Sequence, residues 1–140
     1  LNFYRLIVPK MRIRKNGNII VFGTSSAVYN RPYDGLLTAS KTSLETWIKI
    51  IANEMSPNNI RANLISLSIV DTPNERDLFS KDDFLNWLQP TDIKEIVELL
   101  CYDSRMKFVN GTSIMLYNPS FMYLNERKEN LQKRGARIFE

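Results

Sequence analysis

The chain has 140 residues, of which 44% are hydrophobic, and its formal net charge is +4. This length is typical of one domain, and the hydrophobic content suffices for a core and argues against global disorder. It contains no histidine and a single cysteine, which excludes a Ser-His-Asp triad, a zinc site and an internal disulfide framework. We expect no metal site. No apolar run reaches the roughly 18 residues of a membrane span, and the lone cysteine suits a reducing compartment, so we expect a cytoplasmic protein with no membrane partner.

The positive charge is concentrated at the start of the chain. The first seventeen residues hold no acid and five bases, namely Arg5, Lys10, Arg12, Arg14 and Lys15. A basic stretch can contact nucleic acid, but no aromatic-rich platform accompanies this one. We therefore expect a solvated helix face without a nucleic-acid partner. A basic regulatory or nucleic-acid-binding module is the minor alternative.

In chain order, residues 1–14 predict a helix that Pro9 interrupts, and Asn16-Gly17 predicts a turn. Residues 19–22 form a continuous, largely β-branched apolar run, which favours a strand buried on both faces of a parallel sheet. The polar segment Gly23-Thr24-Ser25-Ser26 follows it. Ligands bind at the carboxyl ends of strands in open α/β sheets, so this segment is a candidate site.

Residues 29–36 contain Pro32 and Gly35 and predict a loop. The strongest helix pattern comes next, because apolar residues recur there at steps of three and four. They are Leu44, Trp47, Ile48, Ile51, Ala52 and Met55. The pattern ends at Ser56-Pro57, and residues 61–68 then predict a second strand.

The remaining part predicts a loop from residue 71, a short helix over 77–88 and a further helix that opens at Pro90. Thr91 is the expected N-cap of this last helix, and Asp92 and Glu95 suit its positive start. Residues 111–117 predict a third strand. From residue 125 the sequence is charged and weakly patterned, so we expect a domain over 1–124 and a tail over 125–140.

Strands that alternate with helices indicate an α/β fold with three parallel strands. Three strands are few for such a sheet. The first is apolar throughout, and nothing upstream could pair with its outer edge, which makes it an aggregation hazard. We therefore expect more of the fold to exist, in residues absent from this chain or in a partner chain.

Seven short motifs follow one another in an order that resembles the carboxyl-terminal half of the short-chain dehydrogenase/reductase (SDR) family. The resemblance covers about residues 9–116 and implies a partial Rossmann-like fold. The motifs are Asn16-Gly17-Asn18-Ile19-Ile20-Val21, Ser25-Ser26, Ala39-Ser40-Lys41, Asn53-Glu54 with Asn59-Ile60-Arg61-Ala62-Asn63, Val70-Asp71-Thr72-Pro73, Pro90-Thr91-Asp92-Ile93, and Val109-Asn110-Gly111-Thr112.

The resemblance also implies roles for single residues. Ser26 occupies the slot of the family's catalytic hydroxyl, and Lys41 that of the cofactor-facing amine. Thr72 resembles the threonine that contacts the nicotinamide carboxamide, so NAD(P) is the implied cofactor. Read without the family, Ser26 is a turn-capping serine and Lys41 a surface lysine of a helix.

The sequence departs from the family's pattern at three places. Leu37 stands in the slot of the catalytic tyrosine, and an aliphatic side chain cannot donate a proton to a developing alkoxide. Leu67-Ser68 replaces the proline-glycine that lets the backbone approach the nicotinamide. The glycine-rich phosphate loop and the catalytic asparagine would both lie before Leu1, so we expect residues 1–140 by themselves to lack the pyrophosphate cradle.

Other tyrosines could serve as the proton donor. Tyr29 and Tyr33 lie twelve and eight residues before Lys41, although loop aromatics that pack over the helix start are the simpler interpretation. Phe79, Phe84 and Trp87 fall where the family covers its substrate, and they suit an apolar substrate and a protein contact equally well.

We therefore predict an SDR-like protein that is non-catalytic on its own and acts as a structural or accessory subunit of a reductase-type complex. The alternative is an NAD(P)-dependent carbonyl or 3-oxoacyl reductase of which this chain is only a part. The resemblance also implies a homo- or hetero-oligomer with an SDR-type subunit. The predicted contact is the helix that bears Leu44, Trp47, Ile48, Ile51 and Met55.

Overall fold

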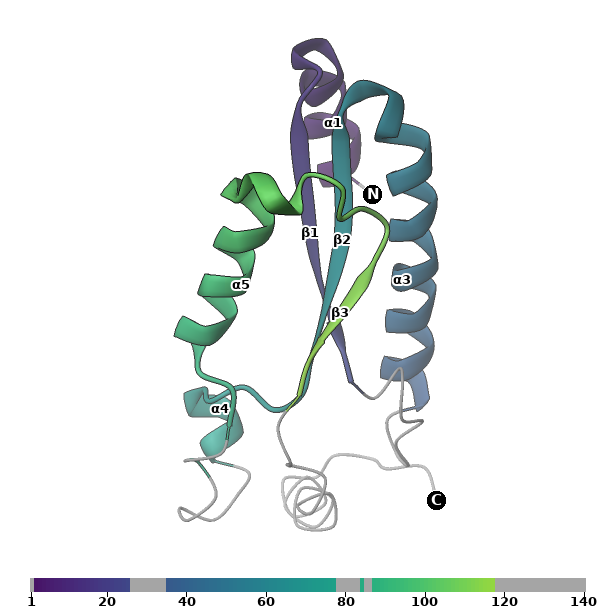
Figure 1. Cartoon of the computed structure of the whole chain (residues 1–140). Coiled ribbons are helices and arrows are strands. Elements are labelled where there is room, and N and C mark those ends of the chain that lie inside the picture. The colour runs from purple at the N-terminus through teal and green to yellow at the C-terminus, as the bar shows by residue number, and fades with distance from the viewer. Residues whose placement is uncertain (1, 26–34, 78–83, 85–86, 118–140) are drawn as a thin grey trace.

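The sheet of this protein has three parallel strands in the order β1-β2-β3. The computed structural model describes residues 2–25, 35–77, 84 and 87–117. The strands are β1 (Gly17–Thr24), β2 (Ile60–Leu67) and β3 (Ser113–Leu116). The helices α1 (Asn2–Arg14) and α3 (Gly35–Met55) pack on one face, and α5 (Pro90–Tyr102) lies on the other (Figure 1). The predicted α/β class with three parallel strands and flanking helices is confirmed.

Helix α1 differs from its prediction in one respect. It runs through Pro9 without a break, although a proline inside a helix removes a backbone hydrogen bond and crowds the preceding turn. Val8 is buried in the core while Pro9 is exposed, so the apolar face of the helix stays anchored on the sheet. Burial of that face offsets the local penalty, and the predicted interruption is wrong.

The loop predicted over residues 29–36 ends earlier than expected, because α3 begins at Gly35. The rest of that loop lies outside the described residues. A short helix, α4 (Pro73–Arg76), stands where a loop was predicted, and the Thr72 side chain accepts a hydrogen bond from its Glu75 amide. The cap therefore converts the start of that loop into a helical turn.

Helix α5 begins at Pro90, as predicted, but its N-cap residue differs from the predicted one. Gln89, not Thr91, is the N-cap, and its backbone N–H donates to Asp92 Oδ2 over 2.9 Å. Leu88 forms a parallel bridge with Val70 and so does not continue the helix predicted over 77–88. Most of that predicted helix, and the whole tail over 125–140, lie outside the described residues.

The core is centred on β2, which has a neighbouring strand on each side. Ile60, Ala62, Leu64 and Ile65 of this strand are buried. On the face covered by α1 and α3, the core also takes in Val8, Ile48, Ile51, Ala52 and Met55. Burial of consecutive residues from Ala62 to Ser66 shows that β2 is covered on both faces, as expected for the centre of a parallel sheet.

Two polar side chains tie β2 to the connection between α5 and β3. The Arg61 guanidinium donates to the carbonyl oxygens of Leu100, Met106 and Val109 at 2.6, 2.9 and 3.2 Å. Asn63, which is 1% exposed, donates to Val109 O and accepts from the Thr112 amide. Buried polar groups are tolerated when they are hydrogen-bonded in this way.

No helix in the part of the chain that the structure describes combines the length and apolarity that a membrane span requires.

We expect Asn63→Ala to lower the free energy of unfolding by about 3 kcal/mol, because it leaves the Val109 carbonyl and the Thr112 amide without this partner inside the protein. Urea denaturation measures the change. Asn53→Ala, at an exposed position of α3, is the matched control, with an effect within about 0.5 kcal/mol. Equal effects of the two variants would contradict a structural role for Asn63.

Candidate functional site

The candidate site lies at the carboxyl edge of the sheet, where β1 ends and α3 begins (Figure 1). Ser25 is fully buried there, and its amide donates to Leu67 O of β2 over 2.8 Å. Ser26, Tyr29 and Tyr33 lie outside the described residues. Their predicted roles, including the catalytic role of Ser26, stay predictions.

The first turns of α3 carry the two residues on which the chemistry depends. Leu37 and Lys41 are four positions apart and therefore lie on the same side of the helix. The leucine side chain is 41% exposed, and the Ser40 hydroxyl beside it donates to the Leu37 carbonyl. An exposed apolar side chain thus occupies the position where the family resemblance calls for a proton donor.

The Lys41 amine is engaged within the chain itself. Its Nζ donates to the carbonyl oxygen of Phe22 in β1 over 3.1 Å. The bond joins the second turn of α3 to the last part of β1, 19 positions earlier in the sequence. The role predicted for Lys41 at the site stays a prediction, and its bond to Phe22 could not be predicted from the sequence.

The Phe22 carbonyl belongs to the outer edge of the sheet. Backbone groups of a strand point alternately to its two sides, and the Ser25 amide bonds to β2. Residues 19, 21 and 23 therefore face β2 as well, whereas Asn18, Ile20 and Phe22 direct their backbone groups away from it. Lys41 caps one carbonyl of this outer edge of β1.

Thr72, the predicted nicotinamide contact, acts in the structure as the N-cap of α4. Its Oγ1 accepts from the Glu75 amide over 3.4 Å, and the side chain is half-buried. An oxygen of this kind has further hydrogen-bonding capacity. Thr72 and Lys41 form no hydrogen bond with each other. The nicotinamide contact predicted for Thr72 stays a prediction.

A charged cluster next to Thr72 was missed by the sequence reasoning. The Asp71 carboxylate, whose side chain is 6% exposed, accepts hydrogen bonds from Arg76 and from Gln89 Nε2 at 3.1 Å. Arg76 also lies over the Phe84 ring, 5.2 Å from its centroid. The five-residue step from Asp71 to Arg76 matches no regular pattern, and Gln89 is remote in sequence, so no sequence signal marked the cluster.

Hydrogen bonding to Arg76 favours the ionised form of this carboxylate. Hydrogen bonds from the guanidinium lower the pKa of Asp71 from its ordinary value of 3.8, and burial opposes this shift only in part. The ionised carboxylate joins the segment after β2 to the start of α5. The cluster is therefore a structural connection at the edge of the candidate site rather than an acid or base poised near neutral pH.

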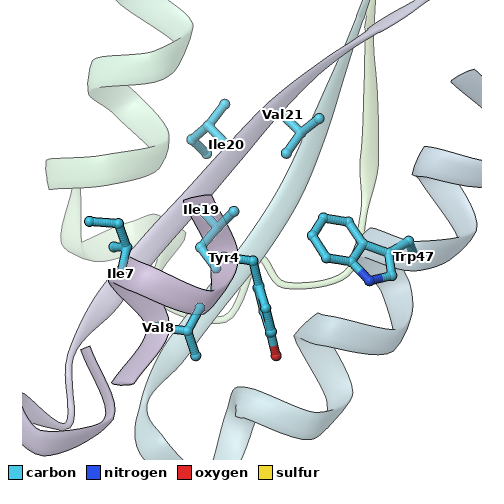
Figure 2. Close-up of a pocket in the computed structure, with 7 residues that line it drawn as sticks. All are labelled: Tyr4, Ile7, Val8, Ile19, Ile20, Val21 and Trp47. Carbon is cyan, nitrogen blue, oxygen red and sulfur yellow. The ribbon is translucent and has the colours of Figure 1, made fainter. Parts of the chain in front are cut away.

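An apolar pocket of about 160 Å³ opens beside β1. Figure 2 shows Tyr4, Val21 and Trp47 converging from three elements, α1, β1 and α3. Tyr4 and Trp47 meet edge to face with ring centroids 5.3 Å apart. The pocket is also lined by Ile7, Val8, Ile19 and Ile20, so it adjoins the outer edge of the sheet.

The described residues do not fit a complete dinucleotide. Lys41 donates to a backbone carbonyl, Thr72 caps a helix, and Leu67-Ser68 keeps side chains where the resemblance calls for proline-glycine. A pyrophosphate is normally held by the N-terminus of a helix that follows a glycine-rich turn, and no such turn precedes a helix in the described ranges. Nor do those ranges contain three or more Cys, Asp or Glu side chains grouped to hold a metal ion.

Residues 1–116 match the family model described as enoyl-(acyl carrier protein) reductase. A curated relative from Mus musculus, dehydrogenase/reductase SDR family member 4, is 26% identical over 122 residues, with 80% of this chain and 43% of the relative aligned. This chain thus spans less than half the length of that relative.

Solved structures of dehydrogenases share the fold of this chain. A short-chain type dehydrogenase/reductase from Mycobacterium ulcerans superposes with a TM-score of 0.73 at 15% identity, over 81% of this chain and 44% of that one. A 4-hydroxyisoleucine dehydrogenase complexed with NADH gives a TM-score of 0.68 at 26% identity, over 81% of this chain and 51% of the other.

We expect Arg76→Gln to raise the pKa of Asp71 toward 3.8, because the guanidinium hydrogen bonds are the largest cause of its lowering. In the native protein the stabilisation from Asp71 is present above the unfolded-state carboxyl pKa, about 3.9, and is lost as pH falls through the lower folded-state value. The variant should lose stability less steeply in that acid range. NMR titration of the Asp71 carboxyl measures the shift.

The matched control is Arg105→Gln, which removes the guanidinium that lowers the pKa of Asp103 to about 2. It should raise the pKa of Asp103 and leave that of Asp71 unchanged. A shift of the Asp71 pKa in the control, or none in Arg76→Gln, would contradict the assignment.

Proposed function

Because the chain belongs to the short-chain dehydrogenase/reductase family, we propose that it is a non-catalytic member that acts as a structural or accessory subunit of a reductase-type assembly. The observation that carries the proposal is the pair Leu37 and Lys41. The first residue offers no proton, and the amine of the second is bonded to the Phe22 carbonyl.

Carbonyl reduction needs a proton donor beside the substrate oxygen and a positioned hydride donor. A lysine assists a neighbouring phenol by placing positive charge beside it, but the corresponding position here holds Leu37, and the amine has no phenol there to assist. The nicotinamide cofactor of the family is bound by more of the fold than the described residues provide. These facts support an accessory role better than independent turnover.

The outer edge of β1 is the surface proposed for the assembly. Its backbone groups at Asn18, Ile20 and Phe22 face away from β2, and the apolar pocket with Trp47 lies beside it. An added strand would bond to this edge while side chains of the same segment fill the pocket. An SDR-type subunit, or further sequence of this protein, could supply such a segment.

Part of the α3 face that was expected to contact another subunit is buried within this chain. Ile48, Ile51 and Met55 are buried within this chain, so they cannot also contact a partner. Leu44 and Trp47 are half-buried and line pockets at the surface. The oligomer stays a proposal, and within α3 these two residues are the part of the predicted stripe that a partner could reach.

The alternative is an NAD(P)-dependent oxidoreductase of which this chain is one part. It is favoured by the relatives, because the mouse protein is named as a dehydrogenase/reductase and the chain aligns with only 43% of it. In that case the cofactor loop and the proton donor would come from outside the described residues. Catalysis would then require Lys41 to exchange the Phe22 carbonyl for the cofactor.

We expect the purified chain to show no turnover of ketones or β-ketoacyl thioesters with NADH or NADPH, because Leu37 cannot donate a proton. Leu37→Tyr should restore little or no activity, since Lys41 remains bonded to Phe22. Oxidation of the nicotinamide, followed by its absorbance, is the measurement. Turnover well above background in the unmodified chain, abolished by Lys41→Ala, would overturn the non-catalytic proposal.

We expect Ile20→Pro to reduce assembly with the SDR-type partner at least about tenfold, because proline removes a backbone donor from the outer edge of β1. That donor is not used by the ladder with β2. Native mass and co-purification of the complex report the loss. Met115→Pro is the matched control, because the alternation along β3 directs the Met115 backbone to the opposite edge of the sheet; an equal loss in both variants would contradict the assignment to β1.

A further inference from the structure

The end of the sheet opposite the candidate site carries an unusual combination of exposed side chains. Parallel strands all begin at one edge, and the segments just before β1 and β3 therefore lie at that edge (Figure 1). Ile13 precedes β1, and Tyr102 and Phe108 precede β3. These side chains are 85%, 86% and 85% exposed, which makes them the three most exposed large hydrophobic residues in the described part of the chain.

One hydrogen bond joins the start of β1 to the end of α5 at this end of the sheet. The Asn18 side chain, at the start of β1, donates to the carbonyl oxygen of Cys101 over 3.1 Å. Cys101 is the neighbour of Tyr102 at the end of α5. We call residues 12–15 and 102–108, which flank this bond at the same end of the sheet, the amino rim.

Positive charge surrounds these hydrophobic side chains. Arg12, Arg14, Lys15 and Lys107 are exposed and make no ion pair with any described residue. Arg105 is neutralised by Asp103, its neighbour on the same rim. Glu54, near the end of α3, adds one negative charge at this end of the sheet, so the described residues of the amino rim keep an excess of positive charge.

We propose that the amino rim binds the surface of an anionic lipid bilayer, in contrast to the expectation from the sequence that the chain has no membrane partner. Exposed aliphatic and aromatic side chains enter the boundary between headgroups and acyl chains, while arginine and lysine attract anionic headgroups. The cytoplasmic location expected from the sequence would bring the chain to a leaflet that carries such lipids. The inference does not depend on whether the chain is catalytic.

A nucleic-acid partner fits the rim less well. Single-stranded nucleic acid is held by aromatic rings whose faces stack on bases, but the Lys107 ammonium lies over the Phe108 ring, 4.9 Å from its centroid. One face of that ring is therefore taken. Ile13 offers no stacking surface, whereas insertion into lipid needs only apolar area.

The test is sedimentation of the full 140-residue chain with vesicles of phosphatidylcholine alone or mixed with phosphatidylserine. We expect binding to the anionic vesicles, weakening as salt rises above physiological strength. Arg12→Gln with Lys107→Gln should weaken it at least about tenfold, since each cation near an anionic surface contributes about 1 kcal/mol. Lys49→Gln with Lys94→Gln removes the same charge from α3 and α5 away from the rim and should change it little.

A second variant, Tyr102→Ser with Phe108→Ser, tests the contribution of the hydrophobic side chains. Both positions are so exposed that the fold should tolerate the changes, and circular dichroism checks that the variant is folded. Leu36→Ser, 82% exposed at the other end of the molecule, is its control. We expect a loss of at least about tenfold in the first variant only. Absent or equal binding to both vesicle types overturns the proposal, as does tighter binding of a single-stranded oligonucleotide that the same substitutions abolish.

Discussion

The structure depends on β2, a strand with a neighbour on each edge and a helical layer on each face. Its apolar side chains at Ile60, Leu64 and Ile65 are buried, and its polar members are satisfied by long-range hydrogen bonds. Arg61 and Asn63 bring in the segment before β3, and Asn110 closes the contact by bonding to the Ala62 amide and to Ala52 O of α3. Both other strands pair with β2, and α3 packs against it, as expected for the central strand of a parallel sheet that is covered on both faces.

The candidate site shows how one apolar substitution changes the use of its neighbours. With leucine at position 37 there is no phenol for the lysine to assist, and the Lys41 amine bonds to the Phe22 carbonyl instead. Lys41 thus lies at both features on which the proposed accessory role rests, the segment with Leu37 in the slot of the proton donor and the outer edge of β1.

Several features were predictable because they depend on local pattern. The stripe from Leu44 to Met55 predicted α3, and the β-branched run at Ile19–Phe22 predicted β1. The errors fall where packing overrides local preference. Pro9 does not interrupt α1, because its neighbour Val8 is anchored in the core. Gln89 replaces Thr91 as the N-cap of α5, two residues earlier than the pattern suggested, directly after the Leu88–Val70 bridge.

The sequence by itself determined the family, the parallel α/β class and the absence of a phenol at position 37, because motif order, hydrophobic period and residue identity are properties of the chain in one dimension. Tertiary structure alone decided which groups meet. The bond from Lys41 to Phe22, the Asp71–Arg76–Gln89 cluster and the amino rim all join residues whose spacing in sequence carries no periodic signal. Such contacts arise only when the strands align in parallel, which places the ends of distant segments at a common edge.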